Sequence, residues 1–191
     1  MTEKININTY KNLIPVYLKE AEAMFGDKTK YKFDEIRYAS DNSPETIISE
    51  SAMMFLERAF EVKLSPHAEV DRTKGIFQLS HEIVHLLSPI DFATEGVMNF
   101  LEEGMAVYFS QVVTERDTGD LEIITTINSK PDYQTALELY KELIKTEPDA
   151  IIKLRKICPV IAHITKNTFV RAGLQTDPGL IDKLVAEFHR Q

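Results

Sequence analysis

Residues 81–85 read HEIVH, and this stretch decides which other parts of the chain must lie beside it. It falls within residues 73–87, a segment that the spacing of apolar residues predicts as a helix ending before Pro89. Two histidines at positions i and i+4 of a helix lie on one face, one turn apart. The imidazoles of His81 and His85 can therefore reach one small cation without bending the backbone.

The glutamate between the two histidines is suited to moving a proton. Glu82 is too close to them in sequence to be a convenient third ligand, but it is well placed to take a proton from a water molecule on the metal. A zinc ion lowers the pKa of such a water to about 7, so a carboxylate can act as its base at neutral pH. The alternative is that both histidines are ordinary core or surface residues.

A second stretch offers the further ligand that a metal needs. Residues 99–109 read NFLEEGMAVYF and contain the neighbouring carboxylates Glu102 and Glu103. A catalytic zinc takes three protein ligands and keeps an open position. We expect a turn at residues 88–93, followed by a helix over residues 94–114 that returns antiparallel to the histidine helix.

Small residues follow these carboxylates. Gly104 costs a helix about 1 kcal/mol relative to alanine, and Ala106 is small as well. Both make sense if this helix approaches the histidine helix closely. The alternative is that Glu102 and Glu103 form a solvated face and that Gly104 is a packing notch.

The two motifs together resemble the gluzincin branch of the zincin metallopeptidases. Members carry HExxH followed by a glutamate in an N-E-G-x-A-type helix, and here HEIVH is followed by EEGMAVYF. Residue by residue, the resemblance makes His81 and His85 the zinc histidines, Glu82 the general base and Glu103 the third ligand. It implies one zinc ion per chain.

Two positions depart from the gluzincin pattern. Glu102 stands where the pattern usually has asparagine, and Val107 stands where some members have an acidic residue that orients a zinc histidine. The resemblance therefore implies that another residue, or a backbone carbonyl, orients the histidine here.

The resemblance also implies a fold. A zincin-like protein is α+β and mainly helical, with a small mixed sheet packed on the HExxH helix and a helical part across a cleft. We expect a single catalytic domain over residues 1–191. Its N-terminal part, residues 1–90, would hold the strands and the HExxH helix, and residues 91–191 would form the helical C-terminal part.

Periodicity predicts the remaining elements. Residues 8–25 fit a helix, residues 31–39 a strand with an irregularity near Asp34, and Val62 and Leu64 a short strand. Residues 45–60 fit either a strand or a helix, and residues 121–127 look extended. Further helices are expected over residues 132–145, 148–156, 158–171 and 177–190, the last begun by Asp177 and Pro178.

Composition narrows the function classes. The chain has 191 residues, a net charge of −8 and one cysteine. An acidic chain is a poor binder of nucleic acid or anionic membranes, because both need basic surfaces. One cysteine excludes an internal disulfide framework and a multi-cysteine metal site. We see no signal peptide and no apolar run of membrane-spanning length, and therefore expect a cytoplasmic protein.

Other residues are weaker candidates. A tyrosine or histidine often assists the oxyanion in such sites, and Tyr133 and His163 are our candidates for that role, although a structural role is the better expectation for each. His67 and His189 are expected at the surface. Lys153, Arg155 and Lys156 form a short basic run that is expected to be a solvated helix face.

The sequence thus predicts a zinc-dependent peptidase that acts on a peptide or protein, with no cofactor besides zinc. Two alternatives stay open. The chain could be a regulatory metal-binding protein on a zincin scaffold, without turnover. It could also be a helical interaction protein in which HEIVH is accidental. The oligomeric state does not follow from the sequence.

Overall fold

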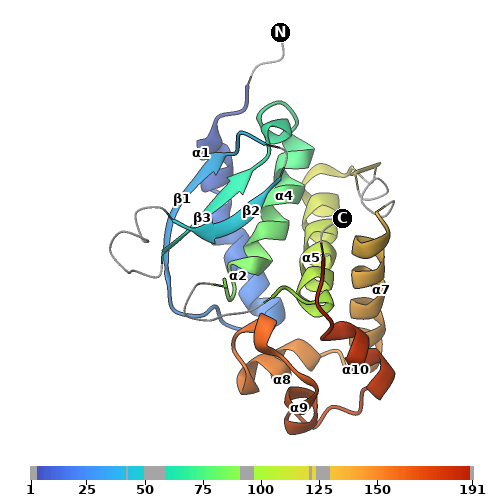
Figure 1. Cartoon of the computed structure of the whole chain (residues 1–191). Coiled ribbons are helices and arrows are strands. Elements are labelled where there is room, and N and C mark those ends of the chain that lie inside the picture. Colours follow the sequence, from blue (N-terminus) through green and yellow to red (C-terminus); the bar gives the residue numbers. More distant parts are fainter. Residues whose placement is uncertain are drawn as a thin grey trace.

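The computed structural model describes residues 4–41, 43–49, 59–90, 97–120, 122–123 and 130–189. In this part of the chain the fold is α+β and mostly helical, with a small mixed sheet (Figure 1). The strands are β1 (Lys32–Tyr38), β2 (Glu45–Ile48) and β3 (Ala59–Leu64). The helices are α1 (Ile7–Lys11), α2 (Ile14–Phe25), η1 (Pro66–Glu69), α4 (Arg72–His85), α5 (Phe100–Thr118), α7 (Pro131–Thr146), α8 (Ala150–Ile157), η2 (Ile161–His163), α9 (Lys166–Arg171) and α10 (Pro178–Leu184).

The elements are arranged around the histidine helix, α4. Figure 1 shows the sheet on one side of α4 and helices α5 and α7 following one another on its other side, with α8, α9 and α10 gathered at one end. One buried apolar core draws residues from the N-terminal helices, the sheet and the C-terminal helices. No helix in the described ranges is long and apolar enough to cross a membrane.

The sheet has the order β1-β3-β2, with β1 parallel and β2 antiparallel to the central β3. The expected irregularity near Asp34 is confirmed, because the register of β1 against β3 shifts between Phe33 and Ile36. Residues 45–60 begin as strand β2, and the stretch 50–58, where a helix was the alternative, lies outside the described residues.

Several element boundaries differ from the prediction. The expected helix over residues 8–25 is two helices, because Pro15 at the start of α2 has no N–H to continue the bonds of α1. Residues 158–171 form η2 and α9 rather than one helix, and α10 ends at Leu184. Asp177 caps α10 as expected. Of residues 121–127, only 122–123 are described, and they are helical rather than extended.

The start of α4 is fixed by a cap and by one close contact. The Asp71 side chain accepts a hydrogen bond from the Lys74 N–H and so satisfies a free amide of the first turn. A Cβ atom at Gly75 would lie 2.0 Å from the Tyr10 hydroxyl oxygen, so only glycine lets α1 lie against α4 here. The Tyr10 hydroxyl donates to the carbonyl of Ala68 at 2.8 Å.

Helix α5 begins at Phe100, later than the predicted start at residue 94. Residues 97 and 98 are not helical, and Asn99 caps the helix by accepting a hydrogen bond from the Glu102 N–H. The backbone of Asn99 is extended and pairs with Glu187, which draws the C-terminal segment to this end of α5. The helix then continues past residue 114 to a left-handed Gly119 with a φ of 66°.

Gly104 serves a different contact from the one expected. We expected it to let α5 approach the histidine helix, with a packing notch as the alternative, and the structure shows a notch that faces α7 instead. A Cβ atom at Gly104 would lie 2.3 Å from the carbonyl oxygen of Ala136 and 2.8 Å from the Cβ of Tyr140, both on α7. Glu103 faces α4, and neighbouring residues of a helix point about 100° apart, so Gly104 meets a different helix.

The expectation of a solvated basic run is wrong for Arg155, which is 5% exposed. Its guanidinium group donates hydrogen bonds to backbone carbonyls at three places. These are the end of α2 (Phe25, Gly26 and Asp27), the residues after α4 (Leu87) and the segment after α8 (Pro159). Arg155 therefore joins α8 to the carboxyl ends of α2 and α4, where a cation is favoured.

The Gly104→Ala substitution tests the α5–α7 contact. Alanine is the better helix former by about 1 kcal/mol, but its methyl group has no room against Ala136. We expect the free energy of unfolding, measured by urea denaturation, to fall by about 1–3 kcal/mol. Val112→Ala on the same helix, at a side chain 39% exposed, is the control and should change it by no more than about 0.5 kcal/mol. Unchanged stability of Gly104→Ala would contradict the contact.

Candidate metal centre

The last turn of α4 meets the first turn of α5 at a cluster of buried ionisable side chains. The two helices run antiparallel (Figure 1). His81 and His85 on α4 lie against Glu103 on α5. His81 Nε2 lies 3.0 Å from Glu103 Oε1, and His85 Nε2 lies 3.8 Å from Glu103 Oε2. The two histidine Nε2 atoms are 3.3 Å apart. The structure thus brings together the three side chains that the sequence suggested as ligands.

The spacing of these atoms suits a zinc ion. Zinc bonds of about 2.1 Å in a tetrahedral arrangement put neighbouring ligand atoms about 3.4 Å apart. The three separations between side-chain atoms given above range from 3.0 to 3.8 Å and so lie on either side of that value. His81 and His85 are 6% and 5% exposed, and Glu103 is fully buried. Two imidazoles and a carboxylate are also the donor set that leaves a coordination position open.

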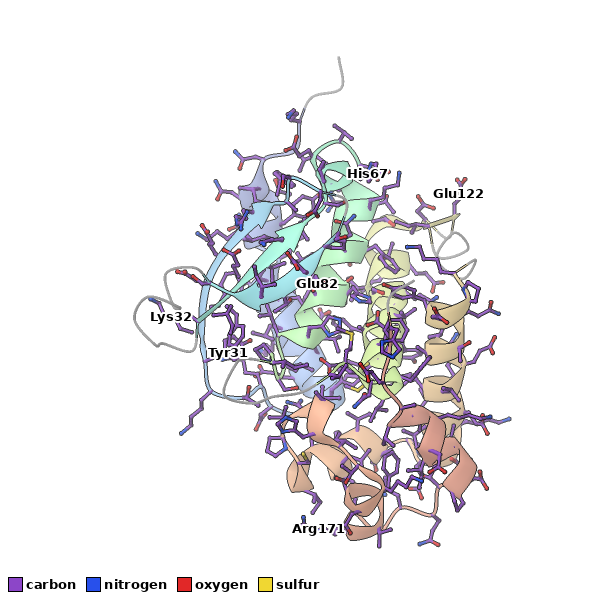
Figure 2. The ribbon with its side chains drawn as sticks, in the orientation of Figure 1. Tyr31, Lys32, His67, Glu82, Glu122 and Arg171 are labelled. Carbon is purple, nitrogen blue, oxygen red and sulfur yellow. The ribbon has the colours of Figure 1, made fainter. Side chains whose placement is uncertain are left out.

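Glu82 lies beside the cluster and faces β2. Figure 2 shows its position where α4 passes the sheet. The Thr46 hydroxyl on β2 lies 3.0 Å from Glu82 Oε2 and 3.2 Å from the Glu82 backbone carbonyl. Glu82 is fully buried, and within the described ranges no group hydrogen-bonds its other oxygen, Oε1. One oxygen is therefore held by Thr46, and the lone pairs of the other are unused by the described residues.

Glu102 binds the far side of His85. Its Oε1 lies 3.0 Å from His85 Nδ1, and both side chains are buried. A carboxylate at one ring nitrogen holds a proton there and leaves the other nitrogen for a metal. Glu102 thus lies at the Nδ1 side of His85, while Glu103 lies at the Nε2 side. This contact was not predicted from the sequence, although the paired glutamates and the missing acid at residue 107 were signals for it.

A cavity of about 210 Å³ opens beside His85. It lies between the end of α4, the start of α5 and strand β2. Its lining, as far as the chain is described, consists of Glu45, Thr46, Glu82, His85, Pro89, Ile90, Met98 and Glu102. Glu82, the candidate general base, and His85 therefore line the same cavity as several apolar side chains.

Tyr133 lies on the other side of the cluster, near the start of α7. Its ring centre is 6.3 Å from that of His81 and 5.3 Å from that of Phe188. The Phe188 N–H donates to the carbonyl of Met98 at 2.8 Å, so the C-terminal segment crosses in front of α5 at this point. The ring of Tyr133 therefore lies close to that of His81, and an oxyanion donor at this site would need such a position.

The other histidines lie away from the cluster. His163, the second candidate for the oxyanion, is exposed in η2 and belongs neither to the cluster nor to the described lining of the cavity. His67 lies exposed in η1 at the far end of α4 (Figure 2), and His189 is also exposed, as expected.

The protonation of His85 is set by its neighbours. Burial lowers its pKa, but the hydrogen bond to Glu102 and the charges of Glu82 and Glu103 outweigh burial and raise the pKa to about 9. Without a metal, His85 is therefore protonated at neutral pH and balances part of the carboxylate charge. A metal at Nε2 would take the place of that proton.

Comparison of the chain with protein-family models, with curated proteins and with solved structures finds no match in any of the three.

The raised pKa of His85 predicts a pH dependence of stability in the chelated protein. The pKa of a histidine in the unfolded chain is about 6.5, so the stabilisation is complete below pH 6.5 and is lost as the pH rises towards 9. We expect the free energy of unfolding in EDTA, measured with urea, to fall between pH 6.5 and 8.5.

Two variants separate this effect from other titrations. His67→Gln removes an exposed histidine and should keep the fall, whereas His85→Gln should abolish it. A flat profile for the unchanged protein over this range would contradict the raised pKa.

Proposed function

We propose that the protein is a zinc-dependent peptidase with a compact, zincin-like catalytic domain. The observation that carries the proposal is the convergence of His81, His85 and Glu103, with the buried carboxylate of Glu82 beside them. A small mixed sheet lies against the HExxH helix and a helical part follows it, as the gluzincin resemblance implies.

The donor set fits zinc, and His81, His85 and Glu103 would hold it. A zinc ion bound there supplies a Lewis acid that polarises a carbonyl group and lowers the pKa of a coordinated water. Glu102 keeps a proton on His85 Nδ1, so that Nε2 offers its lone pair.

Glu82 moves the proton in the proposed reaction. Its Oε1 accepts the proton of the attacking water, since that oxygen has no other partner in the described part of the chain. The same carboxyl group then gives the proton to the leaving amine. The Thr46 hydroxyl holds Oε2 and so keeps the carboxylate from rotating away. Tyr133, beside His81, stays our candidate for the oxyanion donor, and His163 has no support from its placement.

Strand β2 suits the binding of an extended peptide. In the described part of the sheet it is an edge strand, with β3 as its neighbour. The Ser49 N–H donates to the Ala59 carbonyl, which makes these two a hydrogen-bonded pair. Such pairs alternate along an antiparallel ladder, so the main-chain groups of Thr46 and Ile48 point away from β3.

A peptide paired to this edge would pass next to the proposed base, because Thr46 contacts Glu82. Backbone pairing recognises any extended chain, and pockets beside the edge then select its side chains. This favours a peptide or protein substrate over a small ester or amide.

The two alternatives differ from the proposal in testable ways. An accidental HEIVH has little support, because five ionisable side chains buried together, three of them carboxylates, are costly unless they pair or bind a metal. A metal-binding protein without turnover would have the same metal ligands as the proposed peptidase. The buried, partly open carboxylate of Glu82 favours turnover, since binding alone does not need it.

The Glu82→Gln substitution is the direct test. We expect the variant to keep about one zinc per chain, measured by elemental analysis, because Glu82 is not a ligand. Hydrolysis of a peptide mixture should fall by about 10²–10⁴-fold, because the base is lost. Glu142→Gln at an exposed position on α7 is the matched control and should retain both zinc and activity.

Three outcomes would contradict the proposal. Full activity of the chelated protein would exclude a role for the metal. Zinc binding with no hydrolysis of any peptide would favour the regulatory alternative. Absence of bound metal, with no rise in melting temperature on adding zinc, would favour an accidental motif.

A further inference from the structure

The two histidines of the cluster are held in different ways. Glu102 lies 3.0 Å from the Nδ1 atom of His85 and so fixes the plane of that ring. In the described part of the chain, the polar contacts of His81 are with Glu103 and His85, and both are made at its Nε2 atom. The orientation of the His81 ring therefore depends on what packs against it.

Two further aromatic rings lie next to the His81 imidazole. The Phe77 ring, one turn earlier on α4, is stacked on it with ring centres 6.5 Å apart and an interplanar angle of 25°. The Tyr133 ring on α7 lies 6.3 Å away at an angle of 51°. Both distances fall within the range of about 4.5–7 Å in which aromatic rings attract one another. Phe77 belongs to the same helix as His81, so the contact that depends on tertiary packing is the one with Tyr133.

The Tyr133 ring is supported by a residue from the C-terminal segment. Tyr133 is the third residue of α7 and is only half-buried. The Phe188 ring lies 5.3 Å from it at an interplanar angle of 76°, which is an edge-to-face pair. Phe188 is 4% exposed although it follows the end of α10 at Leu184. The segment after α10 is therefore packed against the rest of the fold.

Main-chain hydrogen bonds hold Phe188 in this place. Residues 98–100 and 186–188 pair in an antiparallel manner, and the Phe188 N–H donates to the Met98 carbonyl at 2.8 Å. The Phe100 ring adds a second edge-to-face contact, 5.2 Å from the Phe188 ring. Figure 1 shows the chain turning back after α10 towards α5. Phe188 is thus fixed to the start of α5, the helix that also carries the third proposed ligand.

We propose that the C-terminal segment positions His81 for zinc. Phe188 holds Tyr133, and the Tyr133 ring limits rotation of the His81 imidazole, so that its Nε2 stays directed at Glu103 Oε1, 3.0 Å away. Phe188 and the ring of Tyr133 are positioning groups in this scheme, and the proposed oxyanion role of the Tyr133 hydroxyl is separate. This inference rests on the zinc site of the proposed function and not on its turnover.

The effect of such positioning is on metal affinity. A side chain that is already oriented loses little rotational freedom when a ligand binds, so more of the interaction free energy is left for binding. Groups that orient a metal ligand therefore raise the affinity for the metal without touching it. If the rings only stabilised the fold, their loss would lower the melting temperature and leave the affinity of the folded protein for zinc as it was.

The test measures the zinc dissociation constant of the full-length chain by competition with a chromophoric chelator. Tyr133→Leu should raise this constant about three- to tenfold, because His81 must then be ordered as the metal binds. Tyr133→Phe keeps the ring and should leave the constant unchanged, although it removes the hydroxyl. An equal rise in both variants would assign the effect to the hydroxyl and overturn the ring contact.

A double-variant cycle tests whether Phe188 acts through Tyr133. Phe188→Leu alone should raise the constant several-fold, but it should add little to Tyr133→Leu, because the residue through which it acts is already lost. Phe169→Leu is the matched control, at a fully buried ring on α9 outside the cluster. It should lower the melting temperature and leave the constant unchanged. Full additivity in the cycle, or an equal rise in the control, would overturn the role of Phe188.

The outcomes separate this inference from the function on which it rests. Peptide hydrolysis with the same zinc dissociation constant in Tyr133→Leu as in the unchanged protein would overturn the inference and leave the peptidase standing. The expected pattern of constants without hydrolysis of any peptide would uphold the inference and overturn the peptidase. Failure of the unchanged protein to bind zinc would overturn both.

Discussion

The contact on which the structure depends is the pairing of two buried imidazoles with two buried carboxylates, between the last turn of α4 and the first turn of α5. Each of these groups alone would be expensive to bury. Glu102 and Glu103 lie on opposite nitrogens of His85, and Glu103 also contacts His81. This arrangement requires the two helices to run antiparallel in one register, because a shift by one residue would leave a charge unpaired. The sheet, the caps and the C-terminal helices then secure that register.

The ends of the two helices are secured by polar contacts. Asn99 caps α5, and its side chain amide also donates to the carbonyl of Ile161, so that η2 is tied to the same point. The Arg155 guanidinium group donates hydrogen bonds to backbone carbonyls at the end of α2 and just after α4. The site is therefore built on helices whose ends are satisfied, and such support gives ligands a defined geometry before anything binds.

The sequence was most informative where local spacing determines geometry. HEIVH places two histidines on one helix face, and the helix over residues 73–87 is confirmed apart from its last turn. The contact of Glu102 with His85, the α7 contact of Gly104 and the burial of Arg155 were not predicted. Each depends on which helix lies opposite a given face, and periodicity reports only that a face is buried. The start of the helix over residues 94–114 was misplaced because the cap formed by Asn99 begins the helix after apolar residues whose spacing also fits a helix.

The bridge between Asn99 and Glu187 has a consequence for the order of assembly. Residues 98–100 form main-chain hydrogen bonds with Ala186 and Phe188, which leave the ribosome long after α4 and α5. Contacts between such distant parts of a chain form late, since their loop entropy is lost before they contribute stability. A nascent chain therefore carries its histidine pair before the amino end of α5 is anchored. The first turn of α5, which carries Glu102 and Glu103, is therefore anchored only after the segment around Ala186 and Phe188 has packed against it.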